Sequence, residues 1–253
     1  MSIQKMILLL IENVGWDIFS VKNLKSELEL SDKQIYDALN KLEKNGLIVK
    51  LEKGKYCRHN FSDEYVIGSF IVKNGGIAYW TALNFHGLTE QIPNVVYIQT
   101  TQAKRNKSIF GIRYKFIKVK DQKLVGFKTY GYGNHQFQIT DVEKTIVDCF
   151  DLPQYGGGYN EIIKGFNNAK LSAQKMVKYC KAIDNIAVTK RLGYLCELFN
   201  KPKMDYFIKY AQTVKNKKYN LFESGGEKKG KTNRKWRLII NMNEDEIIEI
   251  GNS

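Results

Sequence analysis

The stretch that decides the fold of the N-terminal part runs from Ser31 to Arg58 and reads SDKQIYDALNKLEKNGLIVKLEKGKYCR. Ser31 is followed three residues later by Gln34, a capping-box pattern that predicts the start of a helix. Gly46 marks the end of that helix, and the residues after it predict a short hairpin that turns at Lys53–Gly54. The predicted helix has an apolar face formed by Ile35, Ala38, Leu39 and Leu42.

Two more helices are predicted ahead of this stretch. Apolar residues recur at helical spacing over residues 3–14, and Gly15 ends that helix. Ser20 is a typical N-cap residue for a second helix over residues 21–28. Three helices, the last two joined by a tight turn, and a hairpin after them predict a winged helix-turn-helix domain over residues 1–60.

The rest of the chain predicts an α+β fold class, with a mixed domain that carries a small antiparallel sheet and a helical C-terminal part. A connecting helix or linker is predicted over residues 61–75, ended by a break at Gly75–Gly76, and a C-terminal domain over residues 76–253. Strand-forming runs lie at 95–101, 109–119, 124–130 and 135–139. Helices are predicted at 77–87, 140–150 (with Thr140 and Glu143 as a second capping box) and within 159–213, before a strand at 236–242.

Charge and composition narrow the class of partner. The chain carries 40 Lys and Arg against 26 Asp and Glu, a net charge of +14, so a polyanion is the expected partner: nucleic acid or, alternatively, a membrane surface. The apolar run Met6–Ile11 is too short for a signal peptide or a membrane span. The four cysteines show no C-x-x-C spacing and form no ligand cluster with the three histidines. We therefore expect reduced thiols in a cytoplasmic protein, with no zinc and no cofactor.

The third predicted helix would be the one that reads DNA, because this helix enters the major groove in the helix-turn-helix class. Lys33, Tyr36 and Asn40 suit base edges, and Lys41 and Lys44 suit phosphates. An ordinary solvated face is the alternative, since residues 1–60 hold ten Lys and Arg against eight acids. With the wing and the cap included, the predicted DNA contacts are Ser31, Lys33, Gln34, Tyr36, Asn40, Lys41, Lys44, Lys53, Lys55 and Arg58.

Features that suggest enzyme chemistry have simpler interpretations. Residues 225–232 match the phosphate-binding pattern G-x-x-x-x-G-K-[ST], but a strand is predicted after them where that loop needs a helix. Glu143, Asp148 and Asp151 could form an acidic metal site, yet capping by Glu143 and an i,i+4 pair of Asp148 with Lys144 explain them better. His86 is interpreted as a helix-end residue. We expect no catalytic residue, no metal site and no enzymatic activity.

Three stretches in the middle of the chain carry a family resemblance. Residues 80–98 (WTALNFHGLTEQIPNVVYI), residues 140–148 (TDVEKTIVD, followed by Pro153 and Gly157–Gly158) and residues 187–195 (AVTKRLGYL) come in this order. Together with the predicted winged helix, the chain resembles the AbiEi antitoxins of type IV toxin–antitoxin systems, over nearly its whole length and more weakly after about residue 205.

The resemblance implies a bifunctional antitoxin. Its winged helix would bind inverted repeats in the promoter of its own operon and repress that operon. The expected partner is therefore double-stranded DNA, and no membrane binding is expected. Its C-terminal domain would counter a nucleotidyltransferase-like toxin without forming a stable complex. Residues 201–237 hold twelve Lys and Arg against three acids, and this basic segment is a candidate antitoxic surface, with Lys228, Lys229, Lys231 and Arg234 as its candidate residues.

Two alternatives stay open at this point. One is a plain transcriptional regulator whose C-terminal domain binds a small molecule or a protein. The other is a nuclease or NTPase that uses the lysine-rich loop at 225–232. A nucleotidyltransferase-like reading frame directly downstream would favour the antitoxin, and nucleotide turnover lost in Lys231→Ala would favour the enzyme.

Overall fold

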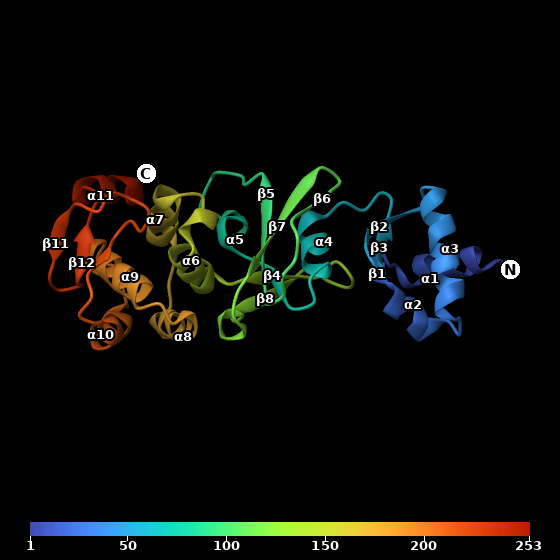
Figure 1. Cartoon of the computed structure of the whole chain (residues 1–253), viewed down its shortest axis with the longest axis horizontal. Coiled ribbons are helices and arrows are strands. Elements are labelled where there is room, and N and C mark those ends of the chain that lie inside the picture. Colours follow the sequence, from blue (N-terminus) through green and yellow to red (C-terminus); the bar gives the residue numbers. More distant parts are fainter.

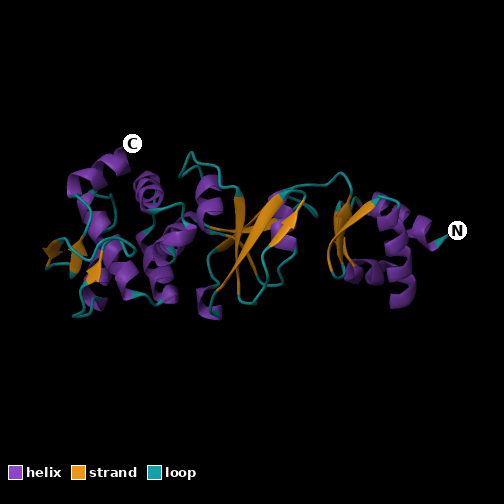
Figure 2. Cartoon of the chain, turned by 45° about the horizontal axis from the view of Figure 1, so that its top comes forward, coloured by secondary structure: helices purple, strands orange, loops and turns teal.

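Three bodies follow one another along the long axis of the molecule in a computed structural model that describes residues 1–253 (Figure 1). A small helical domain with three strands lies at the N-terminal end, a six-stranded sheet lies in the middle, and helices with a small second sheet form the far end (Figure 2). This arrangement confirms the predicted fold class of a winged helix followed by a mixed α and β region with C-terminal helices. No helix has the length and hydrophobicity that crossing a membrane requires.

The N-terminal domain is a winged helix-turn-helix, as predicted. Ser20 and Ser31 both cap their helices in capping boxes, with Asn23 and Gln34 as the partners, and Gly15 ends the first helix with φ at 72°. The buried residues of the third helix are the four predicted ones. Its elements are α1 (Ile3–Val14), β1 (Ile18–Ser20), α2 (Val21–Glu27), α3 (Asp32–Lys44), β2 (Ile48–Glu52) and β3 (Lys55–Arg58), with the antiparallel strand order β1-β3-β2.

The central sheet is mixed and larger than predicted. Its strand order is β6-β7-β5-β4-β9-β8; the β5–β7 and β4–β9 pairs are parallel and the other three pairs are antiparallel. Its elements are α4 (Glu64–Phe70), β4 (Gly75–Ile77), α5 (Tyr79–Phe85), β5 (Val95–Thr100), β6 (Lys107–Ile109), β7 (Ile112–Lys118), the short 3-10 helix η1 (Asp121–Lys123), β8 (Phe127–Tyr130) and β9 (Phe137–Thr140).

The helix before Gly75–Gly76 ends at Phe70, ahead of the predicted break, and both glycines belong to β4, a strand inside the sheet. A Cβ atom on Gly75 would collide with the backbone oxygen of Gln99, and one on Gly76 with that of Gln138. Glycine is therefore required here for close approach of backbones. The helix just before it, α4, has Val66 and Ile67 fully buried in the core of the sheet, so the segment 61–75 is part of this body.

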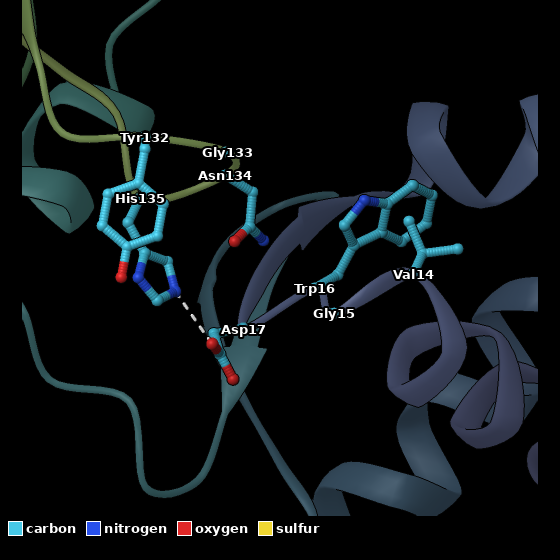
Figure 3. A pocket seen from close by; sticks show the side chains of 8 residues that line it. All are labelled: Val14, Gly15, Trp16, Asp17, Tyr132, Gly133, Asn134 and His135. Carbon is cyan, nitrogen blue, oxygen red and sulfur yellow. Dashed lines mark hydrogen bonds and ion pairs between the residues drawn. The ribbon is translucent and has the colours of Figure 1, made fainter.

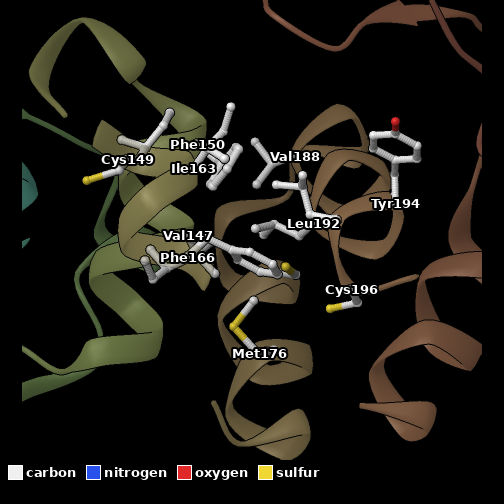
Figure 4. Close-up of a cluster of buried hydrophobic side chains, with 14 of the residues drawn as sticks. Val147, Cys149, Phe150, Ile163, Phe166, Met176, Val188, Leu192, Tyr194 and Cys196 are labelled. Carbon is white, nitrogen blue, oxygen red and sulfur yellow. The ribbon is translucent and has the colours of Figure 1, made fainter. Parts of the chain in front are cut away.

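The C-terminal helices enclose the largest apolar core, a cluster of 33 buried residues. Figure 4 shows side chains from α6, α7, α8 and α9 meeting in it. Trp236, fully buried, lies against Gly193 of α9. The elements are α6 (Val142–Asp151), η2 (Pro153–Tyr155), α7 (Tyr159–Asn168), α8 (Ala173–Ile183), α9 (Ile186–Leu198), α10 (Asp205–Val214), β10 (Asn220–Leu221), β11 (Lys231–Asn233), β12 (Leu238–Ile240) and α11 (Glu244–Asn252).

The second capping box was predicted one residue too early. Asp141, not Thr140, is the N-cap of α6, and its Oδ1 accepts a hydrogen bond from the Lys144 amide at 3.0 Å. Thr140 ends β9 instead, and the Glu143 side chain accepts from the Ser172 amide rather than closing the box. Aspartate is as good an N-cap residue as threonine, so the sequence pattern alone did not separate the two.

Candidate nucleic-acid interface

The third helix of the winged helix, α3, lies on the side of its domain away from the rest of the molecule (Figure 1). Strands β1 to β3 stand between α3 and the central sheet in both views (Figure 2). The apolar face of α3 is buried within the domain, while Lys33, Asn40, Lys41 and Lys44 are exposed. The polar face predicted from the sequence is therefore free to meet a DNA groove.

Ser31 and Gln34 are occupied with each other at the start of α3. The Gln34 side chain accepts from the Ser31 amide at 2.9 Å, and the Ser31 hydroxyl accepts from the Gln34 amide at 3.4 Å. Their role in the structure is to fix where α3 begins. Lys25 forms an ion pair with Asp32 in the first turn, at 2.6 Å, so the acidic residue nearest the helix start is neutralised by a neighbour.

The turn of the wing lies directly beside α3. A Cβ atom on Gly54 would lie 3.5 Å from the hydroxyl of Tyr36, so this half-buried tyrosine packs against the turn. The Val21 amide donates to the Gly54 oxygen at 2.9 Å, which ties the turn to the start of α2. Lys53 at the turn is exposed, as are the polar residues of α3.

Two predicted wing contacts do not belong to this face. Lys55 Nζ donates to the Phe70 oxygen at 2.7 Å and lies 3.0 Å from the carboxylate of Glu52. Arg58 pairs with Asp17 at 3.5 Å. Both residues lie on β3, the middle strand of the small sheet, and their partners are a carboxylate or the central body. Lys55 and Arg58 are thus engaged by partners within the chain, and their contact with DNA stays a prediction.

A set of charged contacts, the wing clamp, joins this hairpin to the central body. It consists of Glu52 and Lys55 on the hairpin and Lys104 and Lys107 near β6. Lys104 Nζ donates to the Glu52 carboxylate and, at 2.6 Å, to the oxygen of Ile71; Lys107 Nζ donates to the Leu51 oxygen. Burial raises the pKa of Glu52, but the hydrogen bonds from Lys104 and Lys55 outweigh it, so the pKa lies below its usual value.

A second junction lies on the far side of the small sheet, around a pocket of about 460 Å³ (Figure 3). His135 Nε2 lies 2.8 Å from the Asp17 carboxylate, and Asn134 donates to the Ile18 oxygen at 3.0 Å. Trp16 and Tyr132 stand on opposite sides of the pocket (Figure 3). Apolar residues of the small sheet, Ile18, Leu51 and Cys57, also share the core of the central sheet. The winged helix is thus held to the body by both polar and apolar contacts.

The lysine-rich loop lies at the opposite end of the molecule from α3 (Figure 1). Strand β11 begins at Lys231, inside the phosphate-binding pattern, so no helix N-terminus follows this loop. The hairpin loop interpreted from the sequence is wrong in one respect: the loop joins β10 to β11, and β12 lies between these two strands. Lys231 pairs with Glu244 at 3.2 Å across an exposed surface. The candidate antitoxic residues Lys228, Lys229, Lys231 and Arg234 are all exposed.

The acidic residues considered for a metal site each have a lysine partner. Asp148 binds Lys144 at 2.5 Å, the pair predicted at i,i+4, and both side chains are fully buried. Glu143 binds Lys175 at 3.0 Å, and Asp151 binds Lys123 at 2.6 Å. His86 is the C-cap of α5, and its Nε2 lies 2.7 Å from the Thr140 oxygen, in agreement with the helix-end interpretation.

Comparison with known proteins supports the winged helix and the whole fold. Residues 6–59 match the family of MCM protein C-terminal winged helix-turn-helix domains. The chain as a whole is similar to the crystal structure of the RV2827C protein from Mycobacterium tuberculosis, with a TM-score of 0.62 and 12% identity, covering 98% of this chain and 94% of that chain. No curated protein matches the sequence. The N-terminal winged helix-turn-helix therefore indicates DNA binding, and the order of the three bodies is a fold shared with another protein.

Proposed function

We propose that this chain is a sequence-specific DNA-binding antitoxin of a type IV toxin–antitoxin system that represses its own operon. The observation that carries the DNA-binding part is the exposed polar face of α3, which is directed away from the body (Figure 1). A helix fits the major groove, which is about 12 Å wide. In that groove Lys33 and Asn40 would reach base edges, and Lys41 and Lys44 would reach phosphates.

The antitoxin part is supported by the three stretches that resemble the AbiEi family. They contribute to packing of the body rather than to isolated surface features: Trp80 of the first stretch lies against Gly157 of the second, and Gly193 of the third lies against Trp236. The residues that carry the resemblance are therefore among those that pack the body of this chain. Inverted repeats in the promoter as the DNA target, and a nucleotidyltransferase-like toxin as a partner without a stable complex, complete this proposal.

The position of the basic segment supports a division of labour between the two ends. The exposed residues Lys228, Lys229, Lys231 and Arg234 lie at the far end from α3, so one surface can act while the other is occupied. We expect the body to act by binding and not by catalysis, since the acids that could serve in chemistry are committed to lysine partners.

A promoter-binding experiment tests the DNA-binding part. The full chain should shift a fragment of its own promoter, and Lys41→Ala/Lys44→Ala should abolish the shift and the repression of a reporter. Lys120→Ala/Lys170→Ala is the matched control, because it removes two exposed lysines from the body and leaves α3 intact. Equal loss of binding in both double variants would mean that α3 is not the reading helix.

A growth-rescue experiment tests the antitoxin part with the same full-length chain. The Lys41→Ala/Lys44→Ala variant should still rescue cells in which the neighbouring nucleotidyltransferase-like toxin is induced. Replacing Lys228, Lys229, Lys231 and Arg234 together by alanine should abolish rescue and leave promoter binding intact. Rescue that persists in this variant would remove the basic segment from the proposal. Failure of the unaltered chain to rescue, at matched expression, would leave a plain transcriptional regulator.

A further inference from the structure

A second pocket, of about 410 Å³, lies on the central sheet where β5, β6 and β7 run side by side (Figure 1). Its volume is in the range of small-molecule sites, roughly 300–1,000 Å³. It is separate from α3, from the basic segment and from the junction in Figure 3. Its walls are Val95, Tyr97, Asn106, Lys107, Ser108, Arg113, Tyr114 and Lys115.

The charge of this pocket is of one sign. Two of its residues, Arg113 and Lys115, are cations on one face of the sheet, and none of the eight is acidic. The third cation, Lys107, is opposite Tyr114 in the register of β6 and β7, so its side chain projects from the other face, where its Nζ donates to the Leu51 oxygen. In the parallel register of β5 and β7, Val95 is opposite Arg113 and Tyr97 is opposite Lys115, so these four side chains project from the same face of the sheet. Arg113 is exposed and belongs to no ion pair, unlike Lys104 of the wing clamp. An anion is therefore the ligand that the charges favour.

Aromatic rings stand next to these cations. Tyr97 and Tyr155 lie with their ring centroids 5.9 Å apart. Lys115 Nζ lies 4.8 Å from the centroid of Tyr155 and 6.0 Å from that of Tyr97, in cation–π contact with both. Both tyrosines are only half-buried, and Tyr97 lines the pocket, so part of its ring faces the ligand space. A phosphate alone would need the cations but not the rings, whereas a planar base stacks on such a ring.

We infer that this pocket binds a nucleoside phosphate, either as a free nucleotide or as a unit of a single strand. Arg113 binds the phosphate through its guanidinium, which matches phosphate oxygens in two parallel hydrogen bonds. Lys115 adds a second positive charge at the same place, and Tyr97 offers a ring face to the base. Ser108, opposite Arg113 in the register of β6 and β7, supplies a hydroxyl group for the base or the sugar. The Asn106 Oδ1 accepts from the Phe116 amide at 3.3 Å, so its amide NH₂ is the group that can donate to the ligand. The inference does not rest on the proposed function.

The test is calorimetric titration of the full-length chain with four probes: ATP, GTP, inorganic phosphate and a short single-stranded oligoribonucleotide. We expect ATP or GTP, or the oligonucleotide, to bind and inorganic phosphate to bind much more weakly. Arg113→Ala should weaken binding by about tenfold or more, since a charge-assisted hydrogen bond is lost. Lys118→Ala is the matched control, because Lys118 is an exposed cation of the same strand that projects from the opposite face.

A second variant separates recognition of the base from recognition of the phosphate. Tyr97→Leu keeps an apolar side chain against the core but removes the ring. It should therefore weaken the binding of nucleoside phosphates and leave the affinity for inorganic phosphate unchanged. Thermal unfolding of each variant checks that the fold is intact, and the exposed Arg113 tests the site even where Tyr97→Leu loses stability. Binding of ATP or GTP but not of the oligonucleotide identifies the ligand as a free nucleotide, and the reverse result identifies it as a unit of a single strand. The inference is overturned if no probe binds, if phosphate binds as tightly as the nucleotides, or if Arg113→Ala and Lys118→Ala bind alike.

Discussion

Lys55 Nζ of the wing donates a hydrogen bond to the backbone oxygen of Phe70 in α4, at 2.7 Å. A cation that the sequence placed on the DNA side of the winged helix therefore holds that domain to the central body. The adjacent contacts of Lys104 and Lys107 with the same hairpin have the same effect. We therefore expect DNA contact chiefly from α3 and from Lys53 at the exposed turn.

The contrast between Lys55 and Lys44 can be measured from the salt dependence of DNA binding. Each phosphate contact contributes a slope of about −0.9 to a plot of log affinity against log salt. We expect Lys44→Ala to flatten the slope by about that amount and Lys55→Ala to leave it unchanged. A flatter slope in Lys55→Ala would return this residue to the DNA surface.

Sequence preference should depend on the two exposed residues suited to base edges, Lys33 and Asn40. Asn40→Ala and Lys33→Ala should each reduce the difference in binding free energy between the promoter and random DNA by about 1–3 kcal/mol. Competition binding with both DNAs measures this difference. Lys41→Ala is the control, because loss of a phosphate contact should weaken binding to both DNAs equally. Unchanged discrimination in both variants would assign base reading to another element.

The wing clamp predicts a dependence of stability on acid. The pKa of Glu52 is lower in the folded chain than in the unfolded chain, so its stabilisation is complete above the ordinary glutamate pKa, about 4.3, and is lost as the pH falls through the lower folded value. We expect the unaltered chain to lose more unfolding free energy than Glu52→Gln in this acid range. Denaturant titrations at a series of pH values below about 4.3 measure the free energy of unfolding of both chains. The control Glu90→Gln, at an exposed carboxylate, should behave like the unaltered chain.

The buried pair of Lys144 and Asp148 gives a test of the core. Lys144→Met leaves the Asp148 carboxylate buried without its partner and should cost about 3–5 kcal/mol of unfolding free energy. The double variant Lys144→Met/Asp148→Leu removes both charges and should be markedly more stable than Lys144→Met. Urea unfolding of the three chains decides the matter, and equal stability of the single and double variants would contradict a buried ion pair.

Most local signals were read correctly from the sequence, although the N-cap of α6 is Asp141 and not Thr140, whereas contacts between distant residues were not predicted. The capping box of Ser31 with Gln34 and the pair of Lys144 with Asp148 each lie within one turn of a helix, where spacing alone predicts the contact. Two successive glycines, Gly75 and Gly76, indicate a break when only neighbouring residues are considered. Their place in a strand depends on the backbones of Gln99 and Gln138, which are remote in the chain. The wing clamp was missed for the same reason, since Lys104 has the sequence surroundings of any solvated lysine.

The wing clamp also determines how two copies could lie on one duplex. Because it fixes the winged helix to an elongated body, the direction in which the body leaves the DNA is set once α3 occupies a groove (Figure 1). Two copies on an inverted repeat would then extend their bodies symmetrically about the two-fold axis, at an angle that depends on the number of base pairs between the half-sites. About half a helical turn of extra DNA, roughly 5 base pairs, would move one body to the opposite side of the duplex. On the proposed inverted repeat, the permitted spacing of half-sites would thus depend on Lys55, Lys104 and Lys107 as much as on the residues that touch DNA.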